Sequence, residues 1–346
     1  MSTDRDVLVA LVNREQAISA TAWRSFWSRV RSRELRAGEA AAIVASLSTC
    51  PPDAASLRTM IATLGEHHER PSEALRGTVN IVGTGGGPRT FNLSTAAAFV
   101  AATIGARVVK SGSRAYTSSC GSIDLLEALG VPLTSSYAET EAAVDAHGIA
   151  CVGSFVYPRE LRLLARRMLP LDIRSLGRFF NAFGPWLAVM PVTAQVTGVS
   201  DPALLAPFRE LARDTTDRRV TICSNATGVD ELVSFAENVV YDGAEDREIR
   251  VAPDSLGLAA GTMEDLRPAE GDAVVGHFLD LLCGRGAPAA IDSIALNAAA
   301  LAVACGAATD LASALAAARD SMHRERPRQL LERIRTPERQ AQLVTA

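Results

Sequence analysis

The sequence predicts an α/β protein in which a small all-helical N-terminal domain precedes a larger domain with a mainly parallel central sheet covered by helices. Two patterns predict this class. The first 70 residues carry apolar residues at helical spacing and show no strand pattern. From Val79 onward, short β-branched runs alternate with Ala- and Leu-rich helical windows, and such alternation is typical of parallel sheets.

The helical domain is expected to span residues 1–70, before a linker at Arg70-Pro71-Ser72. Its apolar spacing predicts helices over Ala17–Arg36, Ala40–Leu47 and Ala54–His67. Because these helices alone cannot make a domain of normal size, we expect them to pack with a later helical segment around residues 158–181, which is rich in Arg and Leu.

The α/β domain is expected to span residues 76–346. The residues 237–253 predict an antiparallel excursion, and two or three helices are expected from Ala273 onward. The other expected elements are strand Val79–Val82, helix Ser94–Ile104, strand Arg107–Val109, helices Ile123–Leu129 and Glu139–His147, strands Ile149–Val152 and Gln195–Val199, helix Pro202–Arg213 and strand Val220–Cys223.

Composition excludes several classes of protein. The chain has 346 residues, of which 48% are hydrophobic, and a net charge of −4 provides no basic field for nucleic acid. No stretch is long and apolar enough to span a membrane, and no signal-peptide pattern opens the chain. The six cysteines form no CxxC pair, so we expect buried free thiols in the cytoplasm rather than disulfides or a zinc site.

Lys110 is the only lysine in the chain, and every other basic side chain except histidine is arginine. A bias that replaced surface lysines by arginines explains the general pattern but not the one exception. Arginine and lysine are close to interchangeable on a solvated surface, whereas a tight phosphate site favours a compact ammonium group. Lys110 is therefore a candidate site residue.

A glycine-rich loop follows the first expected strand and precedes a helix. Glycines let backbone N–H groups approach a phosphate, but a plain tight turn explains the loop equally well. The spacing matches neither the dinucleotide fingerprint nor the Walker loop. The loop consists of Gly83, Thr84, Gly85, Gly86 and Gly87, and the polar residues Asn92, Ser94 and Thr95 stand at the start of the next helix.

Small hydroxylated residues follow the second expected strand, around Lys110. Such strand ends line the ligand crevice of a parallel sheet, although a solvated serine-rich loop has the same composition. The residues concerned are Ser111, Gly112, Ser113 and Arg114, then Ser118, Ser119 and Ser122.

Two adjacent carboxylates, Asp230 and Glu231, come after strand Val220–Cys223 and a short polar loop. We expect the two side chains to face different ways, so that each can hold a hard cation such as Mg²⁺. A solvated helix start is the alternative explanation of the same pair.

Together these segments resemble the anthranilate phosphoribosyltransferase family. The match runs in order from about residue 30 to about residue 330. It rests on Gly83–Gly87, Phe91–Thr95, Lys110–Arg114, Ser118–Gly130, Arg174–Pro185, Asp230–Leu232 and Pro253–Leu258. The resemblance implies a helical domain hinged to an α/β domain, and a homodimer formed through the helical domain.

The resemblance also implies an activity, the transfer of phosphoribose from phosphoribosyl pyrophosphate (PRPP) to a small aromatic acceptor. The implied PRPP ligands are the glycine loop, Asn92, Ser94, Thr95, Lys110, Ser118 and Ser119. Two Mg²⁺ ions are implied on Ser94, Asp230 and Glu231. The acceptor is implied beside Ser111, Ser113, Tyr157 and Arg174, with Arg174 on its carboxylate.

The sequence departs from the family pattern mainly on the acceptor side. A family His and Asn are Ser111 and Ser113 here, and a His before Pro is Tyr157. An Asn-Pro pair after Gly184-Pro185 is missing, and Gly87 replaces an Asp on the donor side in a loop one residue shorter. Because most donor-side matches survive, we expect a changed acceptor on a kept donor site.

Two other functions are compatible with parts of the pattern. A pyrimidine-nucleoside phosphorylase shares the fold and the Lys/Ser phosphate site, but the Phe91–Thr95 segment, Arg174 and the acidic pair favour the transferase. A non-catalytic relative that binds nucleic acid is disfavoured by the acidic net charge and by the retained Lys110.

Overall fold

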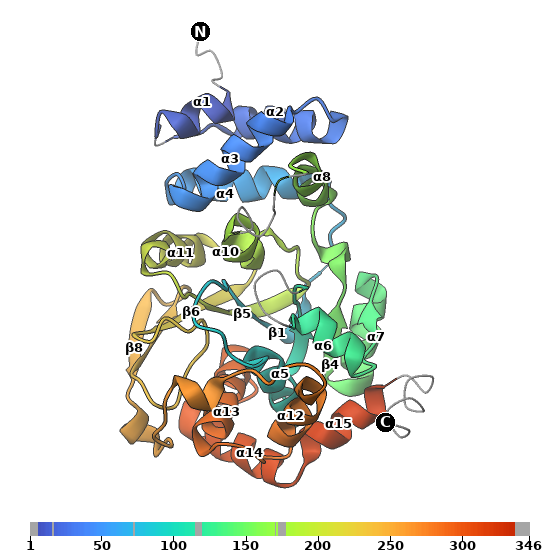
Figure 1. The fold of residues 1–346 in the computed structure, drawn as a ribbon, viewed down its shortest axis with the longest axis vertical. Helices are drawn as coiled ribbons and strands as arrows, with labels where there is room; N and C mark the ends of the chain where they lie inside the picture. Colours follow the sequence, from blue (N-terminus) through green and yellow to red (C-terminus); the bar gives the residue numbers. More distant parts are fainter. Residues whose placement is uncertain are drawn as a thin grey trace.

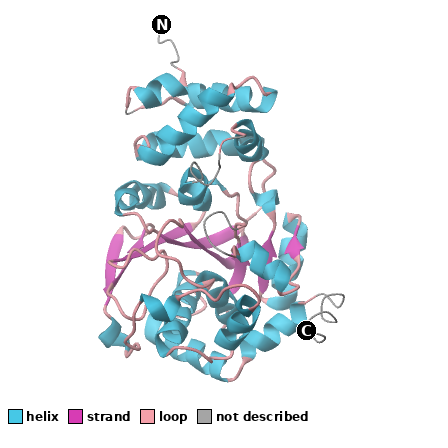
Figure 2. Cartoon of the chain, in the orientation of Figure 1, coloured by secondary structure: helices cyan, strands magenta, loops and turns pink. Residues whose placement is uncertain are grey.

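The structure is a computed structural model that describes residues 6–15, 17–71, 73–114, 120–169, 171 and 178–335. Its centre is an eight-stranded sheet with the strand order β3-β4-β2-β1-β5-β6-β7-β8 (Figure 2). The strands are β1 Leu75–Gly83, β2 Arg107–Lys110, β3 Leu133–Thr134, β4 Ile149–Val152, β5 Val192–Gly198, β6 Arg219–Asn225, β7 Asn238–Asp242 and β8 Arg247–Val251.

Strands β1 to β6 pair in parallel, and β7 and β8 extend the sheet as an antiparallel edge. The mainly parallel sheet and its antiparallel excursion are therefore confirmed. The register places Gly83 opposite Gly198, and Gly198 opposite Cys223. The carboxyl ends of β1, β5 and β6 thus lie side by side at one edge of the sheet.

The helices form layers on both faces of the sheet (Figure 1). Helices α10 and α11 cover one face, α5 and the C-terminal helices cover the other, and α1 to α4 with α8 stack beyond α10 and α11. The helices are α1 Val7–Val12, α2 Ala20–Ser32, α3 Ala37–Thr49, α4 Ala54–Leu64, α5 Leu93–Thr103, α6 Ser122–Ala128, α7 Tyr137–His147, α8 Arg159–Arg167, α10 Arg178–Leu187, α11 Pro202–Asp214, α12 Ala273–Leu282, α13 Pro288–Ala304, α14 Leu311–His323 and α15 Arg326–Ile334.

The N-terminal helices do share their core with a later helical segment. Trp23 and Trp27 are fully buried in one apolar cluster that also contains Leu164 of α8 and Phe183 of α10. The same cluster continues into Phe208 of α11. Packing is therefore continuous from the N-terminal helices to the sheet, and the domain boundary near residue 70 stays a prediction.

Some elements differ from the sequence prediction. Four helices follow Ala273 in the described residues, not two or three, because Glu325 takes a positive φ of 54° and separates α14 from α15. Non-glycine residues rarely adopt this conformation, and the local sequence does not predict it. The short strand β3 was not predicted, since two residues carry no alternation pattern.

The cysteines are all free, and three of them are buried while Cys50 is exposed. The expectation of free thiols is confirmed, whereas the expectation that all are buried is wrong.

In the part of the chain that the structure describes, no helix is long and apolar enough to cross a membrane.

Candidate active site

A cavity of about 250 Å³ lies at the carboxyl ends of β1 and β2, between the acidic loop after β6 and the first turns of α5 and α6. Ligands of open α/β folds bind at this edge of the sheet. The predicted site residues that line the cavity are Gly83, Thr84, Gly85, Gly86, Gly87, Asn92, Ser94, Lys110, Ser113, Tyr157, Asp230 and Glu231. Parallel strand ends thus bring together four segments that are far apart in the sequence.

The glycine loop after β1 packs tightly against the loop that carries Asp230. A Cβ atom on Gly83 would lie 2.0 Å from Oδ2 of Asp230, and one on Gly198 would lie 1.6 Å from the carbonyl oxygen of Asp230. Gly85 and Gly86 have φ values of +62° and +82°, which favour glycine. The sequence suggests approach to a phosphate or a plain tight turn for this loop; at Gly83 the close neighbour is a carboxylate.

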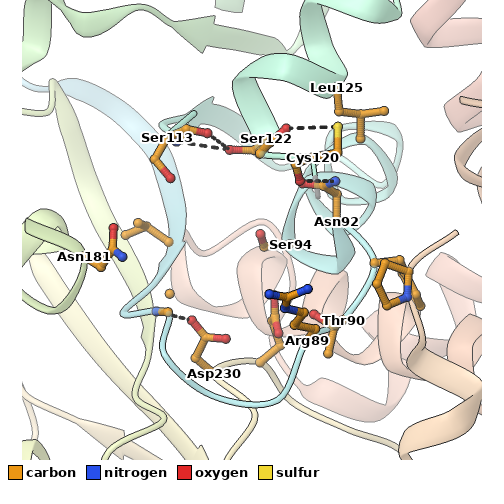
Figure 3. Close-up of a pocket in the computed structure, with 18 of the residues that line it drawn as sticks. Arg89, Thr90, Asn92, Ser94, Ser113, Cys120, Ser122, Leu125, Asn181 and Asp230 are labelled. Atoms are coloured by element: carbon orange, nitrogen blue, oxygen red, sulfur yellow. Dashed lines mark hydrogen bonds between the residues drawn. The ribbon is translucent and has the colours of Figure 1, made fainter. Parts of the chain in front are cut away.

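Asp230 and Glu231 lie in a loop between β6 and β7, and both line the cavity. The alternative of a solvated helix start is therefore wrong, whereas the expectation that the two side chains face different ways stays a prediction. Oδ2 of Asp230 accepts a hydrogen bond of 2.6 Å from the backbone N–H of Gly85 (Figure 3). The backbone N–H of Ser94 at the start of α5 favours the charged form of Glu231 and so opposes the rise in its pKa. The pair therefore lies between the glycine loop and a helix N-terminus.

Side-chain amides hold the acidic loop in place. The amide of Asn225 donates to the carbonyl oxygens of Val229 at 3.2 Å and Glu231 at 2.8 Å. The N–H of Leu232 donates to Oδ1 of Asn297 on α13 at 3.1 Å. Because amides fix the backbone from both sides, the carboxylates do not need to anchor their own loop and are available to the cavity.

Burial raises the pKa of both carboxyl groups, and the charge of Asp230 helps to raise the pKa of Glu231 well above its usual range. Oε2 of Glu231 is buried and has no hydrogen-bond partner among the described residues. A cation would stabilise this arrangement, because the two neighbouring carboxylates are desolvated and not all of their oxygens have hydrogen-bond partners.

Lys110 ends β2 with its side chain almost fully buried, at 3% exposure, while it still lines the cavity. Its ammonium group donates to the carbonyl oxygen of Ser111. Burial lowers the pKa of Lys110 to about 8, and the charges of Glu231 and Asp230 oppose that shift. The only lysine is thus a desolvated cation beside the acidic pair, and desolvation strengthens its attraction for an anion.

The first turn of α5 faces the cavity through Ser94, which lies in the middle of the wall in Figure 3. Asn92 precedes the helix, and its amide donates to the carbonyl oxygen of Cys120 at 3.4 Å. This contact holds the start of α5 against the segment before α6. A helix N-terminus presents a positive partial charge, which favours anionic groups.

Some predicted residues are not in the cavity. Ser111 is buried, and its hydroxyl pairs with the side-chain amide of Asn80 on β1 at 3.0 Å, outside the cavity lining. Thr95 is fully buried within α5 and also lies outside the lining. Strand and helix geometry turns these side chains away from their neighbours Lys110 and Ser94. The other predicted residues, Ser118, Ser119 and Arg174, lie outside the described residues.

Comparison with known proteins connects this geometry to a family. Residues 75–325 match the family model of the glycosyl transferase family, a/b domain. The chain is 33% identical over 308 residues to an anthranilate phosphoribosyltransferase of Parasynechococcus marenigrum, with 88% of this chain and 87% of the relative covered. The chain belongs to the anthranilate phosphoribosyltransferase family. It is accordingly a phosphoribosyltransferase.

Solved structures of the anthranilate phosphoribosyltransferase family have the same fold. The Thermus thermophilus enzyme superposes with a TM-score of 0.81 at 29% identity, covering 95% of this chain and 98% of its own. The Saccharomyces cerevisiae enzyme, solved in complex with PRPP and Mg, has a TM-score of 0.78 at 19% identity, with 94% and 96% covered. The small helical part and the larger α/β part predicted from the sequence are therefore those of the family.

Several residues that were not predicted from the sequence also line the cavity. Asn181 of α10 faces the glycine loop from the opposite wall, and Arg89 lies just beyond that loop (Figure 3). His277 of α12 is packed edge-on against Phe91 with ring centroids 5.8 Å apart. Arg89 stands two residues after the glycine loop, and Asn181 lies in the Arg174–Pro185 segment of the resemblance, so both could have been found from the sequence. His277 reaches the cavity only through tertiary packing.

The residues of the cavity suit Mg²⁺, which can complete its coordination with substrate phosphates. They suit less well a metal ion whose ligands all come from the protein. No group of three His, Cys, Asp or Glu side chains that could hold a metal occurs in the described ranges. The acidic pair with the hydroxyl of Ser94 offers hard oxygen ligands, and Glu231 has an unsatisfied buried oxygen. Mg²⁺ usually binds through one or two carboxylates together with substrate phosphates.

Proposed function

We propose that this phosphoribosyltransferase moves 5-phosphoribose from PRPP to a small aromatic carboxylate in an Mg²⁺-dependent reaction that releases pyrophosphate. One observation carries the proposal: the buried ammonium of Lys110 and the buried carboxylates of Asp230 and Glu231 meet at one cavity beside a glycine loop. The names of the relatives, all 30–35% identical over most of the chain, support the same reaction.

The chemistry needs charge stabilisation and no covalent nucleophile. The bond between ribose C1 and the pyrophosphate oxygen breaks, pyrophosphate carries away the electron pair, and an acceptor atom bonds C1 and loses its proton to water. Negative charge therefore grows on the leaving group, where Lys110 and the N-terminus of α5 stabilise it. An aromatic amine is neutral at pH 7, so the cavity needs no strong general base.

Asp230, Glu231 and Ser94 would hold Mg²⁺, which supplies positive charge to the pyrophosphate oxygens when it is bound. The sequence resemblance implies two ions, and we keep that number as part of the proposal. The protein's own contribution is positional. The backbone N–H of Gly85 fixes the carboxylate of Asp230, so that this carboxylate need not reorganise when the donor binds.

The acceptor is proposed to be an aromatic carboxylate that need not be anthranilate. Of the four acceptor-side departures from the family pattern, Ser113 and Tyr157 line the cavity. Ser111 does not, and residues 188–189, which replace the family's Asn-Pro, line a different cavity. The proposal of a changed acceptor therefore rests on Ser113 and Tyr157, with Arg174 as the proposed partner of the carboxylate.

We also propose that the protein is a cytoplasmic homodimer formed through its helical layer. Four of the five large hydrophobic side chains that are exposed among the described residues are Val9, Val12, Leu169 and Leu171, which belong to α1 and to the segment after α8. Burial of these side chains against a second copy would remove apolar surface from water. The free thiols agree with a reducing compartment.

Identification of the product tests the proposed reaction. The protein is incubated with PRPP, Mg²⁺ and each member of a panel of anthranilate and ring-substituted benzoates, and products are analysed by mass spectrometry. We expect one carboxylate to gain a 5-phosphoribosyl group while an equal amount of pyrophosphate is released. Pyrophosphate release without any ribosylated carboxylate would overturn the acceptor class.

A further inference from the structure

A second cavity, of about 290 Å³, lies on the other side of α10 from the active site. We call it the Arg218 cavity. It is lined by parts of α4, α10 and α11 and by the segments around residues 65–70, 188–190 and 215–218. Figure 1 shows α10 and α11 between the stacked N-terminal helices and the sheet. The Arg218 cavity is therefore placed where the helical layer meets the α/β part.

The Arg218 cavity contains more positive than negative charge. Three arginines line it, Arg58, Arg70 and Arg218, against Asp214 and Asp217. Asp214 is already paired with Arg58, and no carboxylate among the described residues forms an ion pair with Arg70. The guanidinium of Arg70 lies against Gly65, where a Cβ atom would be 2.8 Å away. The guanidinium of Arg70 at the rim of the cavity thus has no counter-ion in the part of the chain that the structure describes.

Arg218 is the most unusual of the three arginines. Its side chain is only 9% exposed, and its one ion-pair partner among the described residues is Asp217 at 3.3 Å, a side chain that is 68% exposed. Its Nε is buried without a hydrogen-bond partner among the described residues. Burial and the nearby charge of Arg70 lower the pKa of Arg218. Burying a guanidinium that is poorly paired is costly, so an arginine here is explained best by a ligand.

The rest of the lining indicates what kind of anion fits. Ile61, Leu187, Met190 and Leu211 supply apolar contacts beside the arginines, and Trp186 lies among them with a buried indole N–H that has no partner in the described residues. The planar guanidinium of arginine can donate two parallel hydrogen bonds to a carboxylate. The apolar walls favour a ligand whose remaining part is hydrocarbon. The combination suits a small organic acid better than inorganic phosphate.

We propose that the Arg218 cavity binds a small organic carboxylate and that the occupant acts on the active site through α10. Gly184 and Pro185 of α10 line the active-site cavity, and the next residues, Trp186 and Leu187, line the Arg218 cavity. A ligand that moves or holds this turn of α10 changes both walls together. Occupancy of one cavity therefore changes affinity in the other, and the coupling is reciprocal.

Calorimetric titration of the full chain tests the site. The probes are cyclohexanecarboxylate, the neutral cyclohexanecarboxamide and inorganic phosphate. We expect the carboxylate to bind, the carboxamide not to bind, and Arg218→Met to weaken carboxylate binding at least about tenfold, as expected for loss of a charge-assisted hydrogen bond. Arg247→Met, at an exposed arginine on β8, is the matched control and should bind like the wild type.

A second variant protects the test against a folding defect. If Arg218→Met lowers the melting temperature, Arg70→Met at the exposed rim is used in its place and should weaken binding in the same way. Carboxylate binding that is equal in wild type and variants would overturn the site, and Arg218-dependent binding of phosphate alone would overturn the ligand class. The titration needs no turnover, so its result is independent of the proposed function.

The coupling has its own measurement. In the presence of the carboxylate probe, the KM for the acceptor should change in the wild type and in Arg247→Met but not in Arg218→Met. An equal change in all three proteins would show that the probe acts in the active-site cavity, and the role of α10 would then be wrong.

Discussion

Oδ2 of Asp230 accepts a hydrogen bond of 2.6 Å from the backbone N–H of Gly85, and this contact joins two loops that are 145 residues apart in the sequence. It depends on glycine at position 83, because any Cβ there would meet the same carboxylate oxygen at 2.0 Å. The geometry of the acidic pair is therefore set by the glycine loop, and the two cannot change independently.

Gly83→Ala should displace the Asp230 side chain and lower kcat/KM for PRPP by about 100-fold, since a shift of about 1 Å at a reacting centre costs that much. Unfolding should be easier by about 1–3 kcal/mol because of the overpacking. The matched control is Gly276→Ala on α12, where a Cβ would meet nothing within 4 Å. Equal activity in both variants would show that the Asp230–Gly85 contact has no role.

Asp230→Asn combined with Glu231→Gln should abolish turnover without loss of stability. The two buried carboxylates repel one another and are costly to charge, so their removal leaves the free energy of unfolding unchanged or higher. Steady-state kinetics and urea denaturation check the two halves. Glu264→Gln, at an exposed glutamate, serves as the control. Normal turnover in the double variant would remove the metal assignment.

Lys110→Arg should be inactive although the charge is kept. Lys110 is 3% exposed, and the larger planar guanidinium does not fit the space of an ammonium group. The barrier should rise by on the order of 3 kcal/mol, as for other groups that stabilise charge in the transition state. Arg107→Lys at the start of the same strand, where the side chain is half-buried and pairs with Asp145, should keep full activity. Near wild-type kcat in Lys110→Arg would mean that the only lysine is a compositional accident.

Activity should fall on the alkaline side of pH 8. The pKa of Lys110 is lowered to about 8, below its usual 10.5, so the ammonium form is present below pH 8 and is lost as the pH rises through that value. The kcat/KM for PRPP should then drop about tenfold per pH unit above pH 8. A profile that stays flat up to pH 10 would contradict the requirement for a charged Lys110.

Strand ends were predictable because strand patterns are local. Val79–Val82 and Val220–Cys223 are short β-branched runs, and a parallel sheet necessarily brings their carboxyl ends together. The glycine loop, Lys110 and Asp230 could therefore be assigned to one site without coordinates. The direction in which individual side chains point could not be predicted from the sequence. Ser111 pairs with Asn80 on the neighbouring strand, while Ser113 reaches the cavity, and only the pairing of β1 with β2 decides between them.

Tertiary packing accounts for the rest. Asn181 lies in the Arg174–Pro185 segment of the resemblance, which gave it no role, and His277 lies on a helix that carries no motif. Both reach the cavity because α10 and α12 cover opposite faces of the sheet. The close approach of Asp230 to Gly83 could not be predicted for a related reason. A glycine that admits a ligand and one that admits a distant carboxylate look the same in the sequence, because both leave out the same Cβ atom.

Pyrophosphate release from PRPP tests the central claim most directly. It is measured with an aromatic carboxylate present, with and without Mg²⁺, in the wild type and in the Asp230→Asn, Glu231→Gln variant. The account predicts release that needs both PRPP and Mg²⁺ in the wild type and none above background in the variant. Release by the variant at the wild-type rate, or release that does not depend on Mg²⁺, would contradict the account.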